Sequence, residues 1–308
     1  MITLSLVIPV FNEGEALEAH LAEIRFHAQQ TGLPCRIILV DDGSSDNTWQ
    51  VCRRLPNVEA IRFSRNFGKE AAILAGLRAT REDLTIVMDS DLEHPPALIP
   101  RMVELWRQGS YQVVEAVKAR RAREPWYRRL GARIFNRSMR TLAGVDLAGQ
   151  SDFKLLTREM VEAYLDLPEA NRFFRGLITW LGPRRAEIPF EVPPSNRRTR
   201  WSFSQLVSLS LSALSSFSYV PLQMITLAGF LTFVGSFLLS LYVLWVKFSG
   251  RAVEGFATVI LVVLFVGSIT MISLGIIGGY LARIYDELKR RPPYVISDQR
   301  HLDSTSSS

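Results

Sequence analysis

Residues 84–93 have the sequence LTIVMDSDLE, a short apolar run that ends in a turn carrying two aspartates and a glutamate. Apolar runs of about five residues bounded by polar turns are typical of buried strands. The first half of the chain repeats the pattern, and we expect strands at 4–10, 36–40, 59–63, 84–88 and 112–117. Helical patterns lie between them, at 15–28, 47–54, 70–79 and 98–106. This alternation predicts βαβ units and an α/β fold with a mostly parallel, Rossmann-like sheet.

Polar or glycine-bearing segments follow the first four predicted strands. They are PVFNE at 9–13, DDGSSD at 41–46, SRNFGK at 64–69 and DSDLE at 89–93. Helix capping explains one such turn, in which Asp46 or Asn47 caps the helix that follows. The carboxyl ends of parallel strands meet at one sheet edge, where ligands bind. Four polar strand ends together therefore indicate a binding site.

Asp89 and Asp91 place two carboxylates on one tight turn after a buried strand. Hard oxygen ligands at this spacing suit Mg²⁺ or Mn²⁺, with phosphate oxygens and water in the remaining positions. Such a metal would neutralise charge on a departing diphosphate. The glycine motifs that cradle phosphate in dinucleotide-binding and P-loop proteins are absent from the sequence. A nucleotide sugar held through carboxylates and a metal fits better.

The chain becomes strongly apolar after residue 200, with no charged residue from 201 to 246. The uncharged spans 221–246 and 255–282 each exceed the roughly 20 residues that cross a bilayer. Basic residues precede the first span and follow the second, so both termini are expected in the cytosol. We expect a cytosolic domain at 1–200, an interfacial amphipathic helix at 201–219, a two-helix transmembrane hairpin at 220–283 and a cytosolic tail at 284–308.

The net charge of +6 comes with basic clusters beside these spans, which favours lipid headgroups over nucleic acid as the partner. Cys35 and Cys52 have no metal-ligand spacing and are interpreted as small apolar residues in a reducing compartment. Glycines in the spans permit close helix packing, which is compatible with a homo-oligomer formed through the membrane helices.

Motifs along nearly the whole chain resemble family 2 glycosyltransferases of GT-A fold. Within that family the chain resembles the polyisoprenyl-phosphate glycosyltransferases, closest to bactoprenol glucosyltransferases and similar to dolichol-phosphate mannose synthase. The matching segments are VIPVFNE at 7–13, VDDGSSD at 40–46, SRNFGKE at 64–70, DSDLEHPP at 89–96, SDFKLL at 151–156, RFFRGL at 172–177 and the tail from Arg283 to Pro292.

The resemblance implies transfer of a single sugar, glucose from UDP-glucose, onto undecaprenyl phosphate with inversion at the anomeric carbon. The reaction would take place at the inner membrane and serve a cell-envelope glycan. It assigns the nucleotide-sugar site to Pro9, Phe11, Asn12, Glu13, Asp41, Asp42, Lys69, Asp89 and Ser90. The metal would lie on Asp89 and Asp91. Glu93 stands where the family usually has Gln and is a candidate third ligand, which leaves the choice of metal open.

Asp152 matches the residue that the family offers as catalytic base, and Asp91 is the second residue assigned to catalysis. A phosphate monoester is largely dianionic at cytosolic pH, so the acceptor scarcely needs deprotonation. Base and positioning group therefore both remain open for Asp152.

The basic stretch 118–123 is either a solvated loop or a lid. In the second case Arg120 and Arg123, with Arg133, bind the acceptor phosphate, because the guanidinium fork suits phosphate oxygens. Arg175, in the RFFRGL segment, is assigned to the same role.

Processive synthases of the superfamily carry Gln-x-x-Arg-Trp, but here Arg197 precedes Arg200-Trp201, which favours single transfer. The sequence also departs there from the Gly-x-Ser-Lys-Trp of its own subgroup. The same enzyme with another donor, of mannose or aminoarabinose type, and a non-catalytic nucleotide-sugar-binding scaffold are the alternatives.

Overall fold

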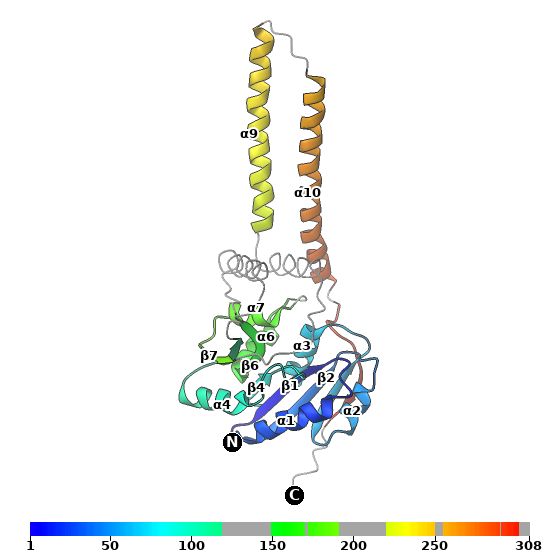
Figure 1. The fold of residues 1–308 in the computed structure, drawn as a ribbon, viewed down its shortest axis with the longest axis vertical. Coiled ribbons are helices and arrows are strands. Elements are labelled where there is room, and N and C mark those ends of the chain that lie inside the picture. Colours follow the sequence, from blue (N-terminus) through cyan, green and yellow to red (C-terminus); the bar gives the residue numbers. More distant parts are fainter. Residues whose placement is uncertain (119–148, 170–171, 191–219, 250–254, 290, 302–308) are drawn as a thin grey trace. The chain divides into compact units, whose positions relative to one another are not determined.

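The computed structural model describes residues 1–118, 149–169, 172–190, 220–249, 255–289 and 291–301. These residues fall into two compact units. One unit holds a sheet with its helices and includes residues 291–301, and the other holds two long helices (Figure 1).

The sheet has eight strands in the order β7-β5-β6-β4-β1-β2-β3-β8. They are β1 (Leu4–Val10), β2 (Cys35–Asp41), β3 (Val58–Phe63), β4 (Leu84–Val87), β5 (Val113–Lys118), β6 (Gln150–Thr157), β7 (Arg185–Phe190) and β8 (Ile296–Arg300). Strands β4, β1, β2 and β3 pair in parallel, as do β5 and β7. Strand β6 runs antiparallel to both of its neighbours, and β8 runs antiparallel to β3. The sheet is therefore mixed but mostly parallel.

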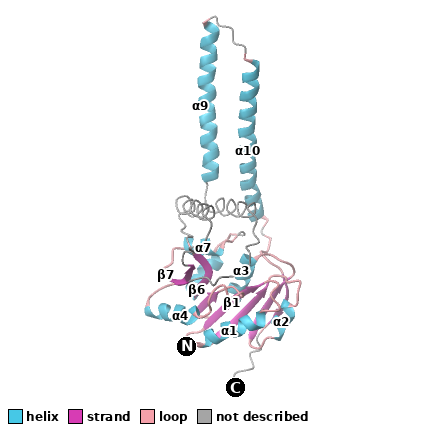
Figure 2. Cartoon of the chain, in the orientation of Figure 1, coloured by secondary structure: helices cyan, strands magenta, loops and turns pink. Residues whose placement is uncertain are grey.

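Helices accompany the strands in the first unit (Figure 2). They are α1 (Leu17–Gln29), α2 (Thr48–Arg54), α3 (Lys69–Ala79), α4 (Leu98–Gln108), α6 (Arg158–Asp166) and α7 (Phe174–Trp180).

Both faces of the central strands are buried, and alternation along β1 shows how they are covered. Leu4, Leu6 and Ile8 belong to a core cluster that includes residues of α1 and α4. Side chains alternate along a strand, so Val7 lies on the other face. There α3 approaches so closely that a Cβ on Gly76 would lie 2.2 Å from Val7 Cγ1. A helix against each face explains why these strands are apolar without alternation.

The second unit contains α9 (Val220–Phe248) and α10 (Phe256–Leu288). Among the described residues, one stretch, Phe265–Ala282 in α10, is apolar enough over a sufficient length to cross a membrane. Helix α9 contains a shorter apolar stretch, Ile225–Leu239. The predicted span 221–246 lies within α9, and the span 255–282 lies within α10 apart from its first residue, Gly255. Membrane crossing by either helix remains a prediction.

The predicted strands and helices of the first half are confirmed, with ends within two residues of those observed. The sequence interpretation did not include β6, β7 or β8. Strand β8 lies in the segment that we expected to be a cytosolic tail. The predicted interfacial helix at 201–219 lies outside the described residues.

Candidate active site

The pairing of β4 with β6 brings two distant aspartates together. Val87 lies opposite Lys154 in this antiparallel ladder, with Ile86 opposite Leu155. When the same register is continued for two residues beyond the end of β4, Asp89 falls beside Asp152. The carboxyl end of β4 therefore meets the beginning of β6, and both acidic side chains lie at one edge of the sheet.

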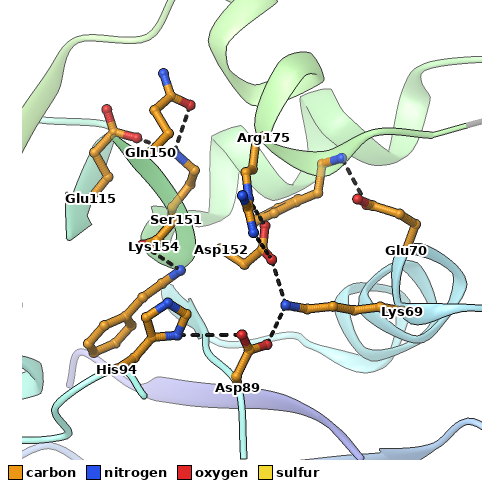
Figure 3. Close-up of polar contacts among 12 residues, drawn as sticks. Lys69, Glu70, Asp89, His94, Glu115, Gln150, Ser151, Asp152, Lys154 and Arg175 are labelled. Carbon is orange, nitrogen blue, oxygen red and sulfur yellow. Dashed lines mark hydrogen bonds and ion pairs between the residues drawn. The ribbon is translucent and has the colours of Figure 1, made fainter. Parts of the chain in front are cut away.

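Lys69 bridges these two carboxylates (Figure 3). Its Nζ lies 2.5 Å from Asp89 Oδ1 and donates a hydrogen bond of 2.6 Å to Asp152 Oδ2. Lys69 is the first residue of α3, so the helix start fixes where the ammonium lies. Burial by itself would lower the pKa of Lys69, but the charges of Asp89 and Asp152 raise it. The lysine is therefore a fixed cation at this edge.

Arg175, on α7, holds Asp152 from the other side. Its Nε donates to Asp152 Oδ1 at 2.5 Å and its Nη2 to Oδ2 at 2.7 Å, the bidentate geometry of strong arginine–carboxylate pairs. Asp152 is only 3% exposed. Burial would raise its pKa, but the hydrogen bond from Arg175 and the charge of Lys69 outweigh this and hold the pKa far below its usual range. Asp152 is therefore an ionised carboxylate with little tendency to accept a proton.

Glu70 holds the start of α7, next to Arg175, through a backbone hydrogen bond. Its Oε2 accepts a 2.8 Å hydrogen bond from the backbone N–H of Phe174, the residue next to Arg175. Burial raises the pKa of Glu70 to about 7, and the charge of Asp152 adds to the effect. Glu70 thereby ties the start of α7 to the start of α3, the two helices that supply the cations.

A buried polar network lies behind Asp152 on the same face of β6. Lys154 is fully buried and pairs with Glu115 of β5, which is 1% exposed. Lys154 also donates to Gln150 Oε1, which in turn accepts from Thr179 Oγ1 on α7. Burial lowers the pKa of Lys154, although Glu115 opposes that shift. This network joins β5, β6 and α7 behind the site.

The ends of β1 and β2 form a second group of polar side chains. Asn12, in the left-handed region at φ 53°, donates its N–H to Ser44 Oγ at 2.9 Å. Its Oδ1 accepts the N–H of Ser45 at 2.9 Å. Glu13 Oε2 accepts a 2.7 Å hydrogen bond from Ser90 Oγ, which links this group to the turn after β4. The predicted meeting of these strand ends is therefore present.

Asp41 and Asp42 are both buried, with different partners. Asp42 accepts hydrogen bonds from the backbone N–H groups of Phe67 and Gly68, so it shapes the loop that leads into Lys69. Burial raises the pKa of Asp42 despite these bonds. Asp41 Oδ1 accepts the N–H of Ser44, and its Oδ2 lies 3.4 Å from Arg62 Nε.

The predicted metal ligands lie on the turn after β4. Asp89 is 26% exposed and has His94 Nδ1 3.6 Å from its Oδ2, while Asp91 Oδ1 accepts the N–H of Glu93. Within the described ranges, no three Asp, Glu, His or Cys side chains form a ready metal cage. Two carboxylates on one turn still suit a hard cation that takes its other ligands from phosphate and water. Asp89 and Asp91 fit that role, with the Lys69 ammonium now beside Asp89.

The remaining predicted residues have simple positions. Pro9 pairs with Val40 in the ladder of β1 and β2, and the Phe11 side chain just beyond β1 is 46% exposed. Arg120, Arg123 and Arg133 lie outside the described residues.

The sequence interpretation gave no role to Glu70, Lys154, His94 or Arg62. Glu70 directly follows Lys69 and Lys154 lies two residues after Asp152, so adjacency to motif residues was the available signal for both.

Residues 5–165 match the family model described as Glycosyl transferase family 2. A glycosyltransferase of Synechocystis sp., named as uncharacterized, is 34% identical across 96% of this chain and 95% of its own length. A bactoprenol glucosyl transferase of Shigella phage SfX is 32% identical across 96% of this chain and 99% of its own length.

The crystal structure of glucosyl-3-phosphoglycerate synthase from Mycobacterium tuberculosis with Mn²⁺, UDP and phosphoglyceric acid has a TM-score of 0.51 at 22% identity. The match covers 68% of this chain and 75% of that one. The fold is thus the GT-A-like fold of sugar-transferring enzymes. The chain belongs to glycosyl transferase family 2, and the protein is a glycosyltransferase.

Proposed function

We propose that this enzyme transfers one glucose from UDP-glucose to a polyisoprenyl phosphate, undecaprenyl phosphate, with inversion of configuration at the anomeric carbon. The reaction would take place at the cytosolic face of the inner membrane. The observation that carries the proposal is the Lys69–Asp152–Arg175 cluster beside Asp89 at the carboxyl ends of the strands. Two cations held there suit a reaction between a diphosphate-linked sugar and a phosphate. The bactoprenol glucosyl transferase relatives support the choice of sugar and acceptor.

The donor would lie across the ends of β1, β2 and β4. Asn12 and Asp41 are both hydrogen-bonded to Ser44 there, and Glu13 is hydrogen-bonded to Ser90. Phe11 offers an exposed aromatic face. Asp89 and Asp91 would hold Mg²⁺ or Mn²⁺, with Glu93 as a candidate third ligand, and a solved neighbour of this fold is in complex with Mn²⁺ and UDP. When bound, the metal would stabilise the charge of the departing diphosphate.

Asp152 acts in this proposal as a positioning group rather than as a base. Its two oxygens are occupied by Lys69 and Arg175, and its depressed pKa makes it a weak proton acceptor. The acceptor phosphate has its second pKa near 6 and is a competent nucleophile without a base. Asp152 would hold Lys69 towards the donor diphosphate and Arg175 towards the acceptor phosphate. Arg120, Arg123 and Arg133 would add further acceptor contacts.

The membrane part of the proposal rests on α9 and α10. Two crossings with both termini in the cytosol would hold the chain at the surface where a lipid phosphate is presented. The apolar stretch of α10 and the lipid named for the relatives support this placement.

A donor screen tests the function. Membranes that contain the full chain are incubated with labelled UDP-glucose, GDP-mannose and other activated sugars. We expect label from UDP-glucose in a chloroform-soluble, mild-acid-labile product, dependent on a divalent metal. Transfer from another donor in place of UDP-glucose would mean that the sugar in the proposal is wrong. The absence of a lipid-linked product with every donor would overturn the proposal.

Asp89→Asn and Asp91→Asn test the metal assignment in the same assay, and both should abolish transfer. The matched control is Asp83→Asn, which removes the same charge at the opposite end of β4, where the Asp83 carboxylate accepts hydrogen bonds from the backbone N–H and the Oγ1 of Thr3. Full activity in both test variants would contradict the metal site.

A further inference from the structure

Strand β8, Ile296–Arg300, is the last strand of the sheet along the described chain. Strand β8 pairs with β3 so that Asp298 lies opposite Arg62 and Gln299 opposite Ile61. Just before it, the Tyr294 ring stacks on Phe63 with centroids 4.8 Å apart. Arg300 Nη1 donates to backbone carbonyls at the end of α2. Backbone pairing, a stacked ring and an arginine anchor hold this segment in one register.

Asp298 connects β8 to a buried tryptophan. Its Oδ2 accepts a 3.1 Å hydrogen bond from Nε1 of Trp49, which lies on α2 and is 4% exposed. A buried indole N–H without an acceptor is costly, so this bond fixes the orientation of the ring. The guanidinium of Arg62 lies over the same ring, 5.8 Å from its centroid, within the range of a cation–π contact.

Arg62 extends this series of contacts to the loop between β2 and α2. Its Nη2 donates to the carbonyl of Ser44 at 3.1 Å, and its Nε lies 3.4 Å from Asp41 Oδ2. Asp41 and Ser44 are 0% and 2% exposed, and Ser44 Oγ receives the N–H of Asn12. Asp298, Trp49 and Arg62 therefore join β8 to the polar group at the ends of β1 and β2.

We propose that β8 is part of the donor-binding machinery: through Asp298, Trp49 and Arg62 it holds the loop at residues 41–47 in the conformation that receives a nucleoside diphosphate. The inference rests on the proposed donor site and adds a positioning residue, Asp298, more than 200 positions away in the sequence. Asp298 touches no reacting group, so its loss should weaken nucleotide binding and leave the chemical step intact.

The test compares Asp298→Ala with Gln299→Ala in the purified full chain in detergent. Gln299 is the next residue of β8, its side chain is exposed, and its replacement should change nothing. For Asp298→Ala we expect the Kd for UDP and the KM for UDP-glucose to rise about fivefold, as for loss of one hydrogen bond, with kcat within about twofold. Asp298→Asn keeps an acceptor oxygen and should restore most of the binding. Unchanged UDP binding in Asp298→Ala, or a loss in kcat alone, would overturn the inference.

Hydrogen exchange separates this inference from the proposed function. In Asp298→Ala, amides of residues 41–48 should exchange at least about fivefold faster, while those of β1 and β4 should not change. If the wild-type chain binds no UDP, the proposed donor is wrong, and this exchange measurement still decides whether β8 orders the loop. Equal exchange in the two proteins would overturn the positioning role.

Discussion

Asp152 is the residue on which the two site cations depend. It accepts hydrogen bonds from Lys69 and from Arg175 at once, and Lys69 also pairs with Asp89. If the three act as one unit, Asp152→Asn and Arg175→Gln should each lower kcat by about 10²-fold, and the double variant should cost little more than either. Single-turnover rates in membranes with saturating donor measure this. Multiplicative losses would instead indicate that Asp152 has a separate role as a base.

Glu70 should make folding stability depend on pH. Its pKa is raised by burial from an ordinary 4.5 to about 7. Below pH 4.5 the carboxyl is protonated in both folded and unfolded chains. Between 4.5 and 7 only the unfolded chain releases the proton, so Glu70 destabilises the fold increasingly as pH rises, by up to about 3 kcal/mol.

Glu70→Gln does not titrate and keeps an acceptor for the Phe174 N–H. The free energy of unfolding of the variant minus that of the wild type should therefore increase by up to about 3 kcal/mol between pH 4.5 and 7.5. Denaturant unfolding at several pH values measures the difference. Glu18→Gln, on the exposed side of α1, is the control and should track the wild type. A parallel pH dependence in Glu70→Gln would contradict the raised pKa.

At the scale of elements, the buried pair between β5 and β6 should matter for stability. Lys154→Met leaves the Glu115 carboxylate buried with Arg185, at 3.4 Å, as its remaining ion-pair partner among the described residues. We expect a loss of about 3 kcal/mol in the free energy of unfolding. Adding Glu115→Gln removes the stranded charge and should recover most of that loss.

The control for this pair is Glu162→Gln, which breaks the exposed ion pair with Arg158 and should change stability by less than about 0.5 kcal/mol. A loss in Lys154→Met no larger than that of the control would contradict a structural role for the buried pair.

The strands that the sequence predicts are those with local signals. The four strands from β1 to β4 are mainly apolar on both faces and end in polar turns, so their places and the meeting of their ends followed from pattern alone. Strand β6 interrupts its apolar residues with Asp152 and Lys154, and both are buried only because partners arrive from β5, α3 and α7. No local pattern reports such pairing. The strand order and the ion pairs of Asp152 with Lys69 and Arg175 could therefore be seen only in the structure.

Strand β8 shows a second limit of sequence reasoning. Residues 296–300, ISDQR, are polar and lie beside a predicted membrane span, so composition favoured a solvated tail. An antiparallel edge strand can be polar because its backbone supplies the pairing. Asp298 and Arg300 use their side chains for contacts that lie far away in the sequence.

At the scale of the whole molecule, the two-crossing topology can be tested with introduced thiols. Ser249→Cys lies after α9, in the segment expected outside the cell, and Ser297→Cys lies on β8, expected in the cytosol. Burial raises the pKa of both native cysteines, Cys35 and Cys52, to about 12, so they should react slowly. A membrane-impermeant maleimide should label Ser249→Cys in intact spheroplasts and Ser297→Cys only after permeabilisation.

The wild-type chain is the control for background labelling. Labelling of both positions before permeabilisation, or of neither, would contradict a two-crossing hairpin.

The place of β8 in the sheet has a consequence for biosynthesis. Strand β3 ends at Phe63, and its partner begins at Ile296, after both long helices. At translation rates of about 5–20 residues per second, the edge of β3 waits roughly 10–50 s for that partner. During this time the nascent chain presents an unpaired strand edge, the kind of surface on which chaperones act and aggregates begin. The ribosome must therefore synthesise α9 and α10 before β8 can pair with β3 and complete the sheet.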